Sequence, residues 1–186
     1  LIGAYASLNN WDGLYRFAWS HHVKRMQEVT GAYRFDAEGD PLAQLSDRIA
    51  IMMFRRGDVS AAKRTVAYQV PQAVYETGDF GKFPTEFQYF GLIAGAGSIP
   101  EGMTVPQNTL VLTSEQAKRP ELLPDKQLSR LWKQLRSKRI AVSSTGELQL
   151  DAKRRSFTVN TPRIACVTLD GGELEAGTLR VRDASC

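Results

Sequence analysis

The sequence predicts an α/β segment followed by an all-β, sandwich-like module, and three observations carry this prediction. The patterns over residues 1–57 indicate a helix, a strand, a loop and a second helix in turn, the order expected of an α/β unit. Residues 77–106 are rich in Gly, Pro and aromatic residues, which favours turns and short strands. Only strand patterns follow residue 139. We therefore expect a domain boundary near residue 60, with one unit over residues 1–59 and a β-rich domain over residues 60–186.

The first unit is predicted to contain two helices around one strand. Helical spacing over residues 2–10 indicates the end of a helix. Residues 14–19 (LYRFAW) are rich in aromatic side chains and predict a buried strand. Asp40-Pro41 is a helix start with Asp40 as N-cap, and Gly57 is the expected C-cap. The apolar residues of this helix fall on one face: Leu42, Leu45, Ile49, Met52 and Met53.

The second domain is predicted to be mostly strands with one amphipathic helix near residues 125–137. Residues 66–70 predict a strand that ends at Pro71. The helix has Leu128, Leu131, Trp132 and Leu135 at core-facing spacing. Residues 147–150 and 157–159 predict a hairpin, and residues 164–169 and 179–181 predict two further strands.

Composition excludes several classes of protein. The 186 residues are 42% hydrophobic and 24% charged, which excludes wholesale disorder. The longest strictly apolar run, residues 49–54, is far shorter than the ~20 residues of a membrane-spanning helix, so no membrane partner is expected. The net charge of +4 allows acidic partners. The basic side chains over residues 126–139 could bind phosphates, but we interpret them as the solvated face of the amphipathic helix and expect no nucleic-acid partner.

The sequence predicts neither a metal nor a cofactor. His21 and His22 are adjacent, and adjacent side chains on an extended chain point to opposite sides. The chain has no HExxH and no CxxC motif. Residues 91–100 superficially resemble a dinucleotide fingerprint, but the last glycine of GxGxxG would fall at Pro100.

The candidate binding residues are Trp19, Ser20, His21 and His22. If residues 14–19 form a parallel strand, these residues lie at its C-terminal end, where ligands collect in (β/α)₈ barrels. An indole offers a flat face to the C–H face of a sugar, and the hydroxyl and imidazoles can hydrogen-bond sugar hydroxyls. The alternative is that Trp19 packs in the core and the histidines are loop residues.

Three stretches together resemble one family. Residues 4–15 (AYASLNNWDGLY) resemble the last helix-to-strand passage of bacterial (β/α)₈-barrel glycoside hydrolases of the large retaining clan. Residues 36–59 resemble the last barrel helix and exit of the same proteins. Residues 145–163 resemble a strand pair of their β-rich C-terminal domain. The resemblance implies the terminal β/α unit of a TIM barrel, with Trp19 as the aromatic residue that closes a sugar subsite.

The same resemblance implies that the two catalytic glutamates lie upstream of Leu1, so that this chain alone is inactive. Retaining and inverting hydrolysis both need two carboxylates. Asp12 precedes the predicted strand and is interpreted as structural. The carboxylates after that strand match no catalytic motif: Glu28, Asp36, Glu38 and Asp40.

We therefore expect the C-terminal fragment of a glycoside hydrolase that acts on an oligo- or polysaccharide, with a parent protein that is secreted or periplasmic. The alternative is a non-catalytic carbohydrate-binding or interaction module. Since a βα unit outside a closed barrel exposes its strand edges and the apolar face of its helix, residues 1–57 are expected to pack poorly alone.

Overall fold

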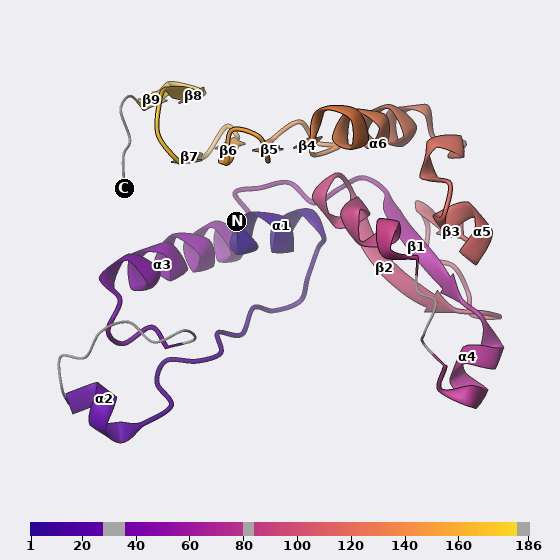
Figure 1. The fold of residues 1–186 in the computed structure, drawn as a ribbon, viewed down its shortest axis with the longest axis horizontal. Coiled ribbons are helices and arrows are strands. Elements are labelled where there is room, and N and C mark those ends of the chain that lie inside the picture. The colour runs from indigo at the N-terminus through magenta and orange to yellow at the C-terminus, as the bar shows by residue number, and fades with distance from the viewer. Residues whose placement is uncertain (28–35, 80–83, 182–186) are drawn as a thin grey trace.

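The computed structural model describes residues 1–27, 36–79 and 84–181. The described chain is a mixed α/β structure with three sheets (Figure 1). Sheet A is parallel with strand order β2-β1-β3, sheet B is antiparallel with order β4-β5-β6-β7, and sheet C pairs β8 with β9. No barrel is closed by the described residues.

Three helices form the first part of the chain: α1 (Ile2–Leu8), α2 (Val23–Gln27) and α3 (Pro41–Arg56). The predicted ends of α3 are confirmed. The Asp40 carboxylate accepts hydrogen bonds from the backbone N–H groups of Leu42 and Ala43, both at 3.0 Å. Gly57 ends the helix with a φ of 60°, a left-handed conformation that glycine adopts without steric cost.

The predicted buried strand over residues 14–19 is wrong. These residues form an extended loop, and the side chains of Tyr15, Phe17 and Trp19 are 96%, 72% and 54% exposed. The loop runs past α3 on the side away from sheets B and C (Figure 1). Aromatic residues favour strands because they pack against neighbouring strands of a sheet. No described strand pairs with this segment. The preference of its aromatic residues for strands therefore does not lead to a strand.

The expectation of an all-β second half is also wrong, because sheet A is a parallel α/β unit. Its central strand β1 (Thr65–Val70) lies between β2 (Gly95–Pro100) and β3 (Thr109–Leu112). Parallel neighbours need a crossover connection. Helix α4 (Gln72–Thr77) and the 3₁₀ helix η1 (Thr85–Leu92) lie in the connection between β1 and β2. Neither helix was predicted from the sequence, because the Gly, Pro and aromatic residues of this stretch favour turns and short strands.

The amphipathic helix is confirmed as α6 (Lys126–Lys138). Short helices α5 (Ser114–Ala117) and η2 (Pro120–Leu122) precede it. Its buried face packs against η1 and sheet A, with the rings of Trp132 and Phe90 stacked at a centroid distance of 4.9 Å. The basic side chains lie on the opposite, exposed face, as predicted.

The C-terminal strands also follow the sequence prediction. Sheet B contains β4 (Ile140–Val142), β5 (Leu148–Asp151), β6 (Ser156–Asn160) and β7 (Ala165–Leu169). The predicted hairpin is the antiparallel β5–β6 pair. Strands β8 (Leu174–Ala176) and β9 (Leu179–Val181) form sheet C, and neither β4 nor β8 was predicted.

Helix α1 connects the first part of the chain to both larger sheets. Its Leu8 is buried in a core that includes Met53 of α3 and Leu148, Phe157 and Val159 of sheet B. The Asn9 amide nitrogen donates to the carbonyl of Gly91 in η1 at 2.9 Å, and its oxygen accepts from the Ala96 N–H of β2, also at 2.9 Å. Residues 1–59 and 60–186 therefore share buried contacts.

The apolar stripe of α3 is largely uncovered. Met53 is the one described residue of this helix that is buried, whereas Leu42 is 74% and Leu45 is 55% exposed. The spacing was correctly recognised, but the described part of the chain supplies no layer against most of this face.

We predict that Gly3→Ala destabilises the protein, because a Cβ atom at Gly3 would lie 2.4 Å from the backbone oxygen of Ala50 in α3. Alanine favours the helix by about 1 kcal/mol, but the two helices must move apart. The expected net loss in the free energy of unfolding is about 1–2 kcal/mol, measured by urea denaturation. Gly97→Ala is the matched control, since its Cβ meets no atom within 4 Å. Equal stability of the two variants would contradict the close helix contact.

Candidate functional site

The predicted site residues lie in the loop that precedes α2. The carbonyl of Trp19 accepts hydrogen bonds from the backbone N–H groups of Ala37 at 3.0 Å and Glu38 at 3.2 Å. The backbone of Trp19 is therefore held in place, while about half of its side-chain surface stays accessible.

The turn that holds Trp19 is itself attached to the start of α3. The Gln44 side-chain amide donates to the carbonyls of Ala37 and Glu38 at 2.9 and 3.0 Å. Asp40 caps the same helix end. The N-terminus of α3 therefore determines where Trp19 and the following residues lie.

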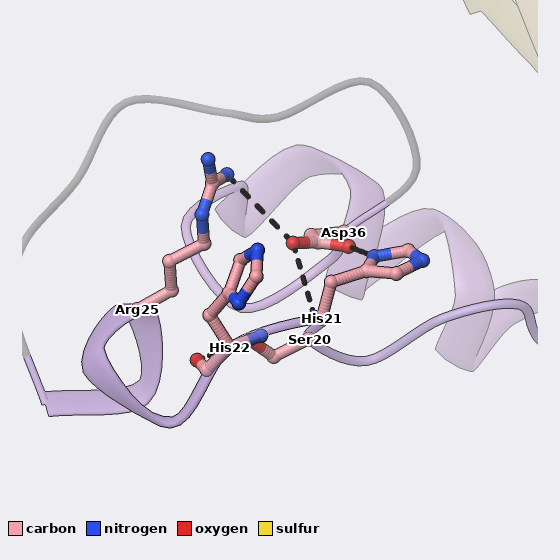
Figure 2. Close-up of polar contacts among 5 residues, drawn as sticks. All are labelled: Ser20, His21, His22, Arg25 and Asp36. Carbon is pink, nitrogen blue, oxygen red and sulfur yellow. Dashed lines mark hydrogen bonds and ion pairs between the residues drawn. The ribbon is translucent and has the colours of Figure 1, made fainter.

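Asp36 is the centre of the polar contacts (Figure 2). It is 3% exposed and lies between the imidazole of His21 and the guanidinium of Arg25. One carboxylate oxygen pairs with Nδ1 of His21. The other accepts from the His21 backbone N–H at 3.3 Å and lies 3.7 Å from Nη1 of Arg25. The carboxylate thus fixes both the backbone and the ring of His21.

The environment of Asp36 lowers the pKa of its carboxyl group. Burial of the carboxylate raises the pKa, but the hydrogen bonds from His21 and the charges of His21 and Arg25 outweigh this effect. Asp36 is therefore ionised at neutral pH and acts as an acceptor. It is unsuited to the role of a general acid, which needs a raised pKa.

Ser20 and His22 are not part of this cluster. The Ser20 hydroxyl donates to the carbonyl of His22 at 3.0 Å and accepts from the His22 N–H at 3.3 Å. This closed local turn shapes the loop before α2. Of the four predicted residues, the structure thus brings His21 together with Asp36, and it holds Trp19 through the adjacent turn.

The site residues that sequence reasoning missed are Asp36 and Arg25. Asp36 lies 15 positions after His21, and no motif links them. The one available signal was a carboxylate in the same loop, and Asp36 was noted only as matching no catalytic motif. Glu28, noted in the same group, lies outside the described residues.

One aromatic side chain contacts the cluster, and others are exposed elsewhere on the same loop. The ring of Phe17 meets the imidazole of His21 edge to face, at a centroid distance of 5.0 Å. Trp11 and Tyr15 are exposed on the same loop. The exposed ring of Phe17 beside an oriented imidazole combines an apolar surface with a hydrogen-bonding group.

The described residues do not provide the ligands that a metal site would need, and the cluster around His21 does not provide the groups that glycoside hydrolysis would need. The described residues contain no group of three or more His, Cys, Asp or Glu side chains placed to hold a metal ion. Among them, no helix has the length and apolar character needed to cross a membrane. The cluster around His21 contains one carboxylate, whereas glycoside hydrolysis needs two.

The comparisons with known proteins do not add to this picture: no family model, no curated protein and no solved structure matches the chain.

We predict that His21→Ala raises the pKa of Asp36. Burial raises this pKa, and in the variant the more distant Arg25 is the remaining group that lowers it. The carboxyl carbon shift of Asp36, followed by NMR from pH 6 to 2, measures this pKa. Because the folded-state pKa is lowered, the stabilisation by Asp36 is complete above the ordinary Asp pKa of about 4. It is lost as the pH falls through the lowered folded-state value.

The control is His22→Ala, since its ring makes no hydrogen bond within the described residues. An unchanged Asp36 titration in His21→Ala would show that the pair does not form in solution.

Proposed function

We propose that this chain is the C-terminal part of a glycoside hydrolase and that it supplies a sugar-binding subsite built on Trp19 and His21. The observation that carries the proposal is the exposed indole of Trp19, whose backbone is held two positions before His21, a histidine with its imidazole oriented by a buried carboxylate. The substrate class is an oligo- or polysaccharide.

The chemistry of a sugar fits this arrangement. A pyranose ring has an apolar C–H face that stacks on an indole, and hydroxyl groups at its edge that hydrogen-bond to an imidazole. Preorganised binding groups lose little conformational entropy when the ligand binds. Ser20 and His22 form the adjoining turn and are the next candidates for contact with the sugar.

The uncovered apolar surfaces support the hydrolase part of the proposal. Residues 14–19 carry exposed aromatic side chains, and the face of α3 that carries Leu42 and Leu45 is also exposed. In the proposed parent, the preceding barrel units cover residues 14–19 and the exposed face of α3. The catalytic carboxylates then come from earlier strands, upstream of Leu1, and the β-rich domain follows the barrel.

The alternative is a non-catalytic carbohydrate-binding or interaction module, in which the strands after residue 60 are the functional unit. The two proposals differ in the role of the loop before α2. In the first, sugar binding depends on Trp19; in the second, it does not.

We predict that Trp19→Ala weakens binding of β-linked oligosaccharides at least about tenfold, because truncation of a central aromatic contact costs about 1.4 kcal/mol or more. Cello-, xylo-, manno- and laminari-oligosaccharides are the probes, and saturation-transfer NMR with the whole chain is the measurement. Trp11→Ala is the matched control, since Trp11 is similarly exposed, at 50%, but lies outside the proposed subsite.

Each outcome separates the proposals. Loss in Trp19→Ala alone supports the subsite. Binding that survives both substitutions favours the non-catalytic module, and no binding at millimolar sugar contradicts both. The coding sequence upstream of Leu1 tests the hydrolase separately, since it must continue alternating β/α units with glutamates at two strand ends.

A further inference from the structure

A cavity of about 570 Å³ lies between η1, α6 and sheet B, remote in sequence from the loop that carries Trp19. Its volume is in the range of small-molecule binding sites. Leu92, Leu135 and Leu150 contribute apolar walls, and all three pack against the core beneath sheet A. The apolar part of a ligand would therefore contact leucine side chains whose positions are already fixed by packing in the core.

Positive charge lines the same cavity. Arg136 and Arg139 lie in and just after the last turn of α6, and both side chains are exposed. Neither guanidinium has an ion-pair partner within residues 1–27, 36–79 and 84–181. The C-terminal end of a helix favours cations, which accounts for basic residues at this position but not for their place around an apolar cavity.

We propose that this cavity binds a small amphipathic carboxylate, with its apolar chain on the leucine walls and its carboxylate between Arg136 and Arg139. Guanidinium groups bind carboxylates through paired, charge-assisted hydrogen bonds. Tyr89 also lines the cavity, and a phenol hydroxyl can donate a further hydrogen bond. The proposal is independent of sugar binding and of the hydrolase assignment.

The experiment titrates the whole chain with octanoate and follows binding by calorimetry. The backbone amide of Ala152 reports the location by NMR, because it lines the cavity and donates to the Arg139 carbonyl at 3.0 Å. 1-Octanol probes the apolar part alone, and acetate probes the carboxylate alone. We expect octanoate to bind at least about tenfold more tightly than either, with a shift of the Ala152 amide.

Substitutions then distinguish binding in this cavity from a general attraction of the anion to the basic helix. The double variant R136Q/R139Q is expected to lose at least about tenfold in octanoate affinity. The double variant K133Q/K138Q removes the same charge from the same helix without touching the cavity, and it is expected to bind octanoate normally. Circular dichroism checks that both variants fold, and R136Q alone serves if the double variant does not.

Three results would overturn the proposal. Equal losses in both double variants would show general attraction to a basic helix. Equal binding of octanol and octanoate would show an apolar cavity with no role for the arginines. No heat and no amide shift at 10 mM octanoate would show that the cavity takes no such ligand.

Discussion

The position of α1 is the constraint on which the rest of the structure depends. This short helix meets α3 at Gly3, where a backbone approach leaves no space for a side chain. Its Leu8 lies in the core under sheet B, and Asn9 at its end bonds to η1 and β2. Helix α1 therefore contacts the antiparallel sheet, the parallel sheet and α3, and it fixes their relative positions. Ser60 reinforces this arrangement, since its N–H and hydroxyl both donate to the Glu147 carboxylate, at 2.6 and 2.8 Å.

The candidate site depends on the same frame through α3. One end of α3 is fixed against α1 and the core, and the other end holds the turn with Ala37 and Glu38 through Gln44. That turn holds the carbonyl of Trp19, and the preceding Asp36 orients His21. The loop has almost no regular structure, yet its binding groups are connected to a helix by specific hydrogen bonds. A loop held in this way can be exposed and still be preorganised.

Sequence reasoning succeeded where the determinants are local. The cap residues of α3, the stripe of α6 and the β5–β6 hairpin are each specified by residues a few positions apart, and each was predicted. It failed where the determinant is distant. Residues 14–19 have the composition of a strand, but a strand exists only with a partner. The same limit applies to the site, because the importance of Asp36 comes from a contact across 15 positions that no spacing rule encodes.

The charge state of Asp36 bears on what the site can do. A buried carboxylate with a lowered pKa, paired with an imidazole and a guanidinium, is a fixed acceptor at neutral pH. Such a group orients the histidine ring and disfavours other ring positions. A catalytic acid would need the opposite environment, with its pKa raised by burial and no cation beside it. The geometry therefore favours recognition over bond cleavage within this cluster. In the proposed hydrolase, this loop binds the sugar, and the carboxylates that cleave the bond come from the remainder of the barrel.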